Sequence, residues 1–389
     1  MATVLLARQL LTPLERIEDA ALLLEDGIIL AVGTRDAVPA PANARIVDFG
    51  DGVLTPGLID IHIHGGAGHD VMEGSDESLA AVERMMARHG VTSYCPTTVT
   101  APLDRTLKAL EDLGKAAQRA ERDGPPDATR ARPLGIHLEG PFLSHARHGV
   151  HPPLYLQSPS ADLFNQMWDA SAGRLLVLTI APELEGALDL IANASRRGVC
   201  VSLGHSNATM PQALAGINAG ARHATHCFNA MRRFDHRDPG LLGMILTDRK
   251  MTADIVADGI HVQPVGVDLF VRAKGIGGAV LITDGISATG MPDGTYKLGS
   301  FEVQLRGHRC ESHGKLAGSV LTLDRAVRNV MQFANVSFQD SVRMATLNPA
   351  RVLGIEHRKG VLQAGADADM VVFSSAGEVR QTIVGGALN

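Results

Sequence analysis

The segment Leu58-Ile59-Asp60-Ile61-His62-Ile63-His64-Gly65-Gly66 sets two histidines at the end of a short apolar run, just before a glycine turn. Other short apolar runs end in the same way, with a histidine or a carboxylate at the turn: Glu139, His205, His226 and Asp284. A parallel barrel gathers the carboxyl ends of its strands on one face, where such side chains meet. The pattern therefore predicts a metal site built on a barrel.

A strand, turn and helix pattern repeats between Pro56 and about Leu353, with helical segments that include 78–89, 184–197, 211–219 and 323–335. Eight alternations favour a closed, TIM-like (β/α)8 barrel of the α/β class over an open doubly wound sheet, where a GxGxxG turn would be expected. The sequence contains no such turn after a strand. The eight expected strands are 58–63, 91–95, 134–138, 175–180, 199–203, 222–225, 252–256 and 279–283.

Both ends of the chain are rich in β-patterns and flank the barrel. An Asp26-Gly27 turn between 21–24 and 28–32 predicts a hairpin, and 370–373 and 379–384 have the pattern of two further strands. Neither piece is large enough to bury a core by itself. We therefore expect 1–55 and 356–389 to form one small β-sandwich domain, and 56–355 to form the metal-dependent barrel.

A Gly-rich, polar stretch at about 291–315 follows the eighth expected strand. It is too long for an ordinary connection in a barrel, and insertions of this length often act as lids over the site. We expect a lid-like insertion there.

Composition and charge exclude two classes of partner. The hydrophobic share is 45% and the charged share 20%, and no apolar stretch approaches the roughly 20 residues that a membrane helix needs. A formal net charge of -6 without a Lys/Arg block argues against a nucleic-acid surface. The N-terminus has no secretory signal pattern, and the four cysteines have no CxxC spacing. We therefore expect a cytoplasmic protein with reduced thiols.

The histidines and the carboxylate at the strand ends are suited to binding divalent metal. His62 and His64 lie two residues apart on one strand, so they face the same side and can bind one ion. The fourth expected strand holds no Lys that could be modified into a bridging anion. Glu139 is then the natural bridge or ligand, and His205 and His226 would complete a second ligand set.

Asp284 stands at the end of the last expected strand. A carboxylate there can ligate a metal, take a proton from water and return it to a leaving amine. The implied reaction is hydrolysis of an amide or a related C–N bond.

The chain carries seven ordered motifs: His62-Ile63-His64-Gly65, His137-Leu138-Glu139-Gly140-Pro141, Gly204-His205-Ser206-Asn207-Ala208, Thr225-His226-Cys227-Phe228-Asn229-Ala230-Met231, Asp258-Gly259-Ile260-His261-Val262, Thr283-Asp284-Gly285-Ile286 and Leu316-Ala317-Gly318-Ser319. Together these motifs resemble the N-acetylglucosamine-6-phosphate deacetylases of the amidohydrolase superfamily, and the match runs across nearly the whole chain. The resemblance implies removal of the acetyl group from a 2-acetamido sugar phosphate, in aminosugar catabolism or cell-wall recycling.

The resemblance also implies roles for single residues. The main catalytic metal would be held by Glu139, His205 and His226, with Asp284 as base and acid. His151 would help to polarise the acetyl carbonyl and His261 would contact the sugar. The Asn229-Ala230 backbone would contact the phosphate together with Arg237, which would reach in from the neighbouring subunit of a homodimer.

Members of the resembled family differ at the first strand, and this chain keeps both His62 and His64. One or two divalent ions per subunit are therefore chemically possible. Zinc is the expected metal and iron is an alternative, because imidazole and carboxylate suit both.

Three other functions stay open at this point. The substrate could be N-acetylgalactosamine 6-phosphate, whose single epimeric hydroxyl the motifs do not distinguish. An amidohydrolase acting on N-acyl amino acids or dipeptides is a more distant alternative, against which the Asn-Ala-Met phosphate loop counts. A catalytically inactive binding protein on the same scaffold is the third, and the complete ligand set argues against it.

Overall fold

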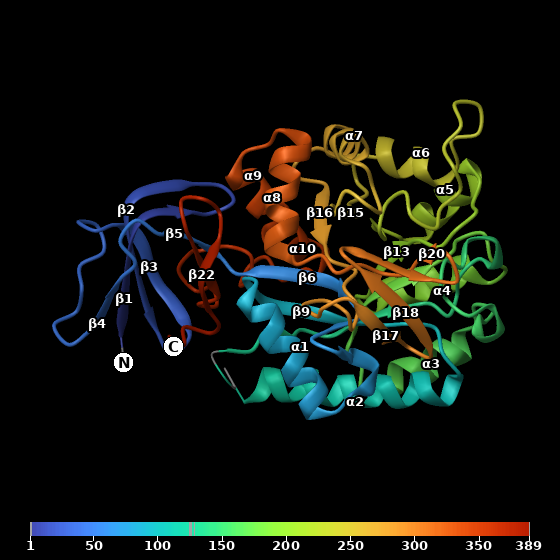
Figure 1. Cartoon of the computed structure of the whole chain (residues 1–389), viewed down its shortest axis with the longest axis horizontal. Coiled ribbons are helices and arrows are strands. Elements are labelled where there is room, and N and C mark those ends of the chain that lie inside the picture. The colour runs from blue at the N-terminus through green and yellow to red at the C-terminus, as the bar shows by residue number, and fades with distance from the viewer. Residues whose placement is uncertain (1, 124–126, 128, 389) are drawn as a thin grey trace.

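The structure is a computed structural model that describes residues 2–123, 127 and 129–388. A small sheet and a larger barrel lie side by side, and both ends of the chain are in the small sheet (Figure 1). No helix among the described residues is long and apolar enough to cross a membrane.

The small sheet joins strands from both ends of the sequence, as expected. The β-strands are β1 (Thr3–Leu11), β2 (Arg16–Glu25), β3 (Ile28–Thr34), β4 (Arg45–Asp48), β5 (Val53–Pro56), β21 (Met370–Phe373) and β22 (Val379–Ile383). Within the described chain they form one hydrogen-bonded sheet in the order β22-β21-β5-β1-β2-β3, with β4 paired to β1. The expected hairpin between β2 and β3 is confirmed, and Asp26 and Gly27 have φ of 49° and 80°, as its tight turn requires.

The expected parallel barrel is also confirmed, because each of the predicted runs contains a strand. Hydrogen bonds connect β6 to β9 and then β9, β11, β12, β13 and β14 in order, and β15 pairs with β16. The first and last strands meet where Asp284 N–H donates to His62 O at 2.9 Å. The barrel strands are β6 (Leu58–Ile63), β9 (Val91–Thr98), β11 (Ile136–Glu139), β12 (Leu175–Ile180), β13 (Cys200–Leu203), β14 (His223–Ala224), β15 (Ala253–Val256) and β16 (Ala279–Ile282).

Helices cover the outside of the barrel strands (Figure 1). The first one shows why they form where they do: Ser75 accepts a hydrogen bond from Ser78 N–H at the start, acidic residues fill the first turn and Arg88 lies in the last. The helices are α1 (Asp76–Arg88), α2 (Leu103–Arg122), α3 (Ala161–Ala170), α4 (Ala187–Arg196), α5 (Met210–Ala219), α6 (Gly240–Thr247), α7 (Pro264–Lys274), α8 (Leu323–Ala334), α9 (Phe338–Met344) and α10 (Leu347–Val352). Shorter pieces are the 3-10 turns η1 (Val71–Glu73), η2 (His145–Arg147) and η3 (Pro153–Tyr155) and the strands β7 (Gly65–Gly66), β8 (His69–Asp70) and β10 (Arg132–Pro133).

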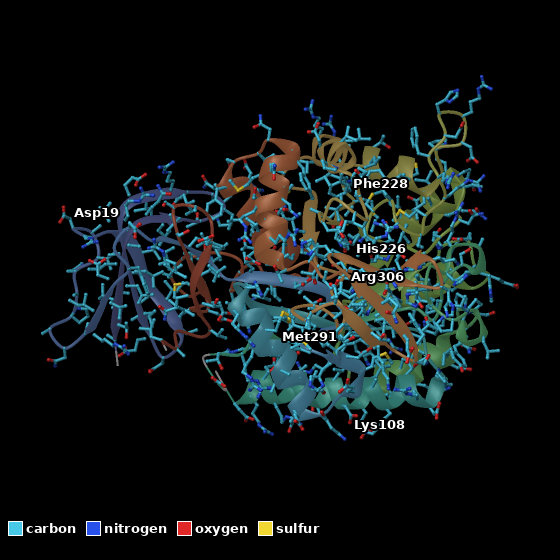
Figure 2. The ribbon with its side chains drawn as sticks, viewed as in Figure 1. Asp19, Lys108, His226, Phe228, Met291 and Arg306 are labelled. Atoms are coloured by element: carbon cyan, nitrogen blue, oxygen red, sulfur yellow. The ribbon has the colours of Figure 1, made fainter. Side chains whose placement is uncertain are left out.

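The stretch expected to be an insertion folds into an antiparallel sheet of its own. Its strands are β17 (Gly294–Leu298), β18 (Phe301–Arg306), β19 (Arg309–Ser312) and β20 (Lys315–Leu316), paired in that order. Figure 2 labels Arg306 at the end of β18 and Met291 shortly before β17, whereas Lys108 on α2 and Asp19 on β2 lie at the periphery of the molecule. The insertion packs onto the barrel, since its Leu298, Val303 and Leu305 share one buried apolar cluster with barrel residues such as Met72 and Val99.

A buried ion pair lies where the small sheet meets the barrel. The Lys359 ammonium is 2% exposed and contacts the carboxylates of Asp367, at 2.9 Å, and Asp369. The main chain of Asp369 accepts a hydrogen bond from Gly57 N–H, next to the first barrel strand. Burial tends to raise the pKa of Asp369, but the charges of Lys359 and Arg132 outweigh it and lower that pKa.

We expect Lys359→Met to lower the free energy of unfolding by about 3–5 kcal/mol, because it leaves the buried Asp369 carboxylate without its ammonium partner, whereas Asp367 keeps Arg358 at 3.3 Å. Urea unfolding at pH 7 measures this loss. The difference in free energy of unfolding between the wild type and the variant should become smaller as the pH falls toward 4, because the carboxylates that have lost Lys359 then take up protons.

Arg380→Met is the matched control, since Arg380 pairs with Asp51 in an ion pair that is 41% and 64% exposed. It should shift the unfolding midpoint little. If the two variants lower the unfolding midpoint equally, the buried ion pair contributes no more to stability than the exposed one.

Candidate active site

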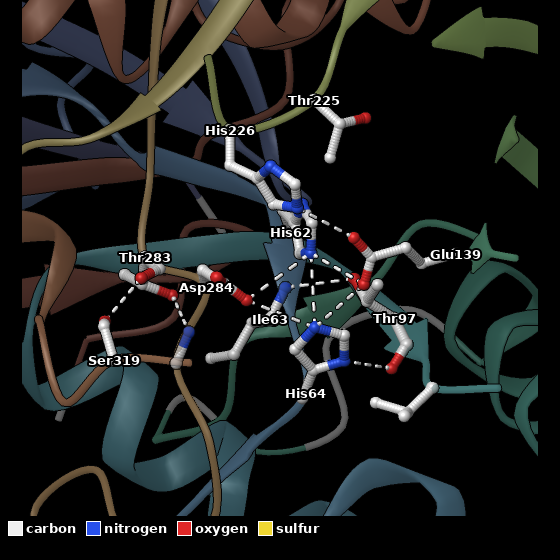
Figure 3. A network of polar contacts seen from close by, with 12 residues as sticks. His62, Ile63, His64, Thr97, Glu139, Thr225, His226, Thr283, Asp284 and Ser319 are labelled. Atoms are coloured by element: carbon white, nitrogen blue, oxygen red, sulfur yellow. Dashed lines mark hydrogen bonds and ion pairs between the residues drawn. The ribbon is translucent and has the colours of Figure 1, made fainter. Parts of the chain in front are cut away.

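Side chains from the carboxyl ends of several barrel strands line one cavity of about 140 Å³. Figure 3 shows the side chains of His62, His64, Glu139, His226 and Asp284 converging. The lining includes all the predicted metal ligands except His62, which is fully buried beside His64. The cavity lining is His64, Val99, Glu139, Gly149, Val150, His151, His205, His226, Asn229, Ala230, His261, Asp284, Leu298, Leu316 and Gly318.

One group of possible metal ligands joins the first and last strands. The Nε2 atoms of His62 and His64 lie 3.2 Å apart. Asp284 Oδ1 lies 3.2 Å from His64 Nε2 and 3.6 Å from His62 Nε2. The ligand atoms of these three residues all lie within 4.8 Å of one another, a spacing that suits a single ion.

Glu139 connects this group to a second one. Its Oε2 lies 3.3 Å from His64 Nε2 and 3.4 Å from His62 Nε2. Its Oε1 lies 3.1 Å from the Nε2 atoms of both His205 and His226, which are themselves 3.0 Å apart. The carboxylate is 2% exposed, so it is a buried bridge between two pairs of imidazoles.

Backbone carbonyls fix which ring nitrogen faces the cavity. His64 Nδ1 donates to Thr97 O at 3.0 Å, and His205 Nδ1 donates to Arg147 O at 3.0 Å. A carbonyl can only accept, so the neutral form of each ring presents the lone pair of Nε2 to the cluster. These rings are oriented as metal-binding histidines are.

His151 has the opposite orientation. Its Nδ1 accepts from Thr100 N–H, at 3.2 Å, and contacts the Thr100 hydroxyl at 2.9 Å. An N–H can only donate, so Nε2 of the neutral ring carries the proton, and that atom lies 3.4 Å from Glu139 Oε2. Gly140 leaves room for the Thr100 hydroxyl that contacts His151. Its φ is 79°, and a Cβ at this position would lie 2.5 Å from the Thr100 hydroxyl oxygen. His151 therefore presents a hydrogen-bond donor where its neighbours present acceptors.

Neighbouring charges and hydrogen bonds outweigh burial in setting the pKa values of Asp284 and His64. Burial tends to raise the pKa of Asp284, but the hydrogen bond to His64 and the charge of His62 lower it to about 2. Burial tends to lower the pKa of His64, but contacts with Asp284 and Glu139 raise it to about 10. The protein thus holds positive charge at the place where a divalent cation would bring its own.

Three of the converging residues have a left-handed backbone conformation, which is uncommon for residues other than glycine. His205, His226 and Asp284 each lie two residues beyond the end of a barrel strand, with φ of 46°, 30° and 51°. Such strain persists only where the surrounding structure enforces it, and it is concentrated at functional sites.

The predicted substrate contacts are only partly brought together. Asn229, Ala230 and His261 line the cavity, and His261 Nδ1 contacts Asp258 Oδ2 at 2.7 Å. Asn229 N–H already donates to His226 O at 2.9 Å. Arg237 is exposed and does not line the cavity, because it belongs to the loop between β14 and α6, which projects from the barrel (Figure 1).

Sequence reasoning missed two buried carboxylates that support the ligands. Asp60 accepts from His62 N–H at 3.2 Å and from the Thr283 hydroxyl at 2.6 Å. Asp254 accepts from His226 N–H, and its other oxygen lies 2.9 Å from His223 Nε2. The period of two along the first strand places Asp60 on the face of His62 and would have identified it, whereas no local signal connects Asp254 with His226.

Comparison with known proteins gives a consistent result. The model of the amidohydrolase family matches residues 53–388. The chain is 40% identical to N-acetylgalactosamine-6-phosphate deacetylase of Escherichia coli O157:H7, over 100% of this chain and 99% of that protein. It is 39% identical to N-acetylglucosamine-6-phosphate deacetylase of Vibrio furnissii, over 94% and 89%.

A solved structure extends this similarity to the fold. It is a mutant of N-acetyl-D-glucosamine-6-phosphate deacetylase from Mycobacterium smegmatis, in complex with N-acetyl-D-glucosamine-6-phosphate. It superposes with a TM-score of 0.90 at 33% identity and covers 99% of this chain and 98% of that one.

We expect Glu139→Gln to lose most of the bound divalent metal, because both groups of histidines face this one carboxylate. The number of metal ions per chain after dialysis tests this and is measured by inductively coupled plasma mass spectrometry. His357→Asn, at an exposed position, is the control and should keep its metal. Full retention by the Glu139 variant would show that the carboxylate is not a ligand.

Proposed function

The chain belongs to the amidohydrolase family, and from that premise we propose that it hydrolyses N-acetyl-D-glucosamine 6-phosphate to D-glucosamine 6-phosphate and acetate. The observation that carries the proposal is the cavity in which the Glu139 bridge, the Asp284 carboxylate and the donor face of His151 meet. The full-length similarity to deacetylases of N-acetylated amino-sugar phosphates supports the same reaction. Its place is aminosugar catabolism or cell-wall recycling.

The donor set fits one or two divalent cations per subunit, with zinc as the first choice and iron as the alternative. Glu139, His205 and His226 would hold the main ion, and His62, His64 and Asp284 would complete a second site. Such an ion supplies Lewis-acid chemistry, polarising a carbonyl oxygen and lowering the pKa of water.

Asp284 is the general base and acid of the proposed reaction. Its carboxylate is partly buried and lines the cavity, and its pKa is lowered to about 2, so it is ionised at neutral pH. It accepts a proton from the attacking water while the oxygen bonds to the acetyl carbon, and it returns that proton to the nitrogen as the C–N bond breaks. His151 donates a hydrogen bond from Nε2 to the acetyl oxygen, which carries the developing negative charge.

The phosphate is the second group of the substrate that the site must bind. The backbone N–H of Asn229 and one N–H of its side-chain amide donate to His226 O, so the Ala230 N–H and the second N–H of that amide are the donors for a phosphate oxygen. His261 contacts the sugar. Arg237 reaches the phosphate of the neighbouring subunit, which is why the homodimer is part of the proposal.

We propose the cytoplasm as the location of the enzyme. Its four cysteines are free and three of them are buried, which is compatible with a reducing compartment.

Acetate release from N-acetylglucosamine 6-phosphate by metal-replete protein tests the proposed reaction. We expect the phosphorylated gluco sugar to be preferred over both the galacto epimer and the unphosphorylated sugar. Asp284→Asn should lower kcat by about 10²- to 10⁴-fold, because it removes the proton-transferring group. If only the galacto epimer is hydrolysed, the substrate is N-acetylgalactosamine 6-phosphate instead. If only the unphosphorylated sugar is hydrolysed, the proposed phosphate contacts are wrong.

Subunit complementation tests the role of Arg237. Arg237→Ala and Asp284→Asn should each be nearly inactive. A mixed dimer should regain about half of the activity of a wild-type dimer, since one of its two sites has an intact Asp284 together with the partner's Arg237. Acetate release after mixing and refolding measures this, with sedimentation velocity to establish the dimer. If mixing restores nothing while dimers form, Arg237 does not act across the interface.

A further inference from the structure

Three apolar side chains that line the active-site cavity belong to one apolar cluster and form an apolar wall. They are Val99, Val150 and Leu298. Leu316 also lines the cavity, and apart from glycines and Ala230 the remaining lining residues are polar. The wall includes residues of the barrel, of the loop after η2 and of the inserted sheet. The proposed proton transfers and the phosphate contacts use none of these side chains.

The apolar wall lies beside His151. Val150 precedes His151 in the chain, and Val99 precedes Thr100, whose N–H donates to His151 Nδ1 at 3.2 Å. The two valines are therefore chain neighbours of His151 and of the residue that anchors its ring, and both line the same cavity as His151. A carbonyl that accepts from His151 Nε2 must direct its alkyl group toward one of the nearby walls, and the apolar wall is the favourable one.

Leu298 is the member of this wall that the insertion contributes, and it is held firmly. It is 1% exposed and packs in the cluster that contains Val99, Val303 and Leu305. On one side of it, Lys297 O accepts from the Ser287 hydroxyl. On the other side, Gly299 N–H donates to Asp70 Oδ2 at 2.6 Å. Because both neighbours are fixed to the barrel, the side chain cannot withdraw easily to admit a larger group.

We propose that Val99, Val150 and Leu298 form the acyl pocket of this enzyme, and that Leu298 restricts it to the acetyl group. This inference rests on the proposed deacetylase function and adds its acyl specificity. A longer acyl chain meets Leu298, and an N-glycolyl hydroxyl has no partner on this wall. Buried polar groups without partners are strongly disfavoured, so both kinds of substrate are selected against.

An acyl series tests the proposal. N-acetyl, N-propionyl, N-butyryl and N-glycolyl glucosamine 6-phosphate are compared by kcat/KM, following release of the free amine. The wild type should lose on the order of 10-fold per added methylene and on the order of 10-fold for the glycolyl group. Leu298→Ala should raise the butyryl-to-acetyl ratio by about 10-fold or more.

Leu305→Ala is the matched control, because Leu305 is 2% exposed in the same cluster but does not line the cavity. It should keep the wild-type ratio, even if it destabilises the fold to a similar degree. Val99→Ala is a second variant of the wall, for use if Leu298→Ala does not fold, and it should shift the ratio in the same direction.

An unchanged ratio in the folded wall variants, with acetyl hydrolysis intact, would overturn the acyl pocket and leave the deacetylase function standing. The same shift in Leu305→Ala would also overturn it, since the effect would then come from loosening of the insertion. Absence of hydrolysis for every member of the series by the wild type would remove the proposed function itself, and the acyl pocket with it.

Discussion

The buried carboxylate of Glu139 is the constraint on which the rest of the site depends. An ion this deeply buried is tolerated only when opposite charge and hydrogen-bond donors surround it. Imidazoles from the first, fifth and sixth barrel strands meet its two oxygens, and His151 approaches from a loop. The barrel therefore has to bring residues together that are far apart in the sequence, and its closure between β6 and β16 adds Asp284 to the same cluster.

Position along each strand matters as much as residue type. His205, His226 and Asp284 all leave their strands through a left-handed residue, which turns each side chain back over the barrel mouth. A flexible loop would relax such strain, whereas parallel strands with buried carboxylates beneath them do not. Asp254 serves this purpose for His226, whose backbone N–H it accepts, and Asp60 does so for Asp284, because it accepts from the hydroxyl of the preceding Thr283. The strain and its support form one unit of the structure.

The barrel and the identity of its converging residues could be predicted because both depend on local patterns. Apolar runs of strand length, several of them ending in a histidine or a carboxylate, indicate the strands and their order. The pairing of Asp254 with His226 and the contact of Leu298 with the cavity join segments that only the folded chain brings together, and no local spacing encodes them. Arg237 shows a different limit of prediction from sequence. It is exposed in the single chain, so its proposed role depends on a dimer, and the sequence of one chain does not describe how two chains assemble.

The sheet shared by the two ends of the chain has a consequence for biosynthesis. β5 pairs with β1 on one edge and with β21 on the other, and about 300 residues of barrel separate the two partners in the sequence. On the ribosome, β1 to β5 emerge first and wait with an open hydrogen-bonding edge until the last strands have been translated. Such an edge can pair with other nascent chains, so during this interval the N-terminal strands depend on rapid barrel folding or on chaperones.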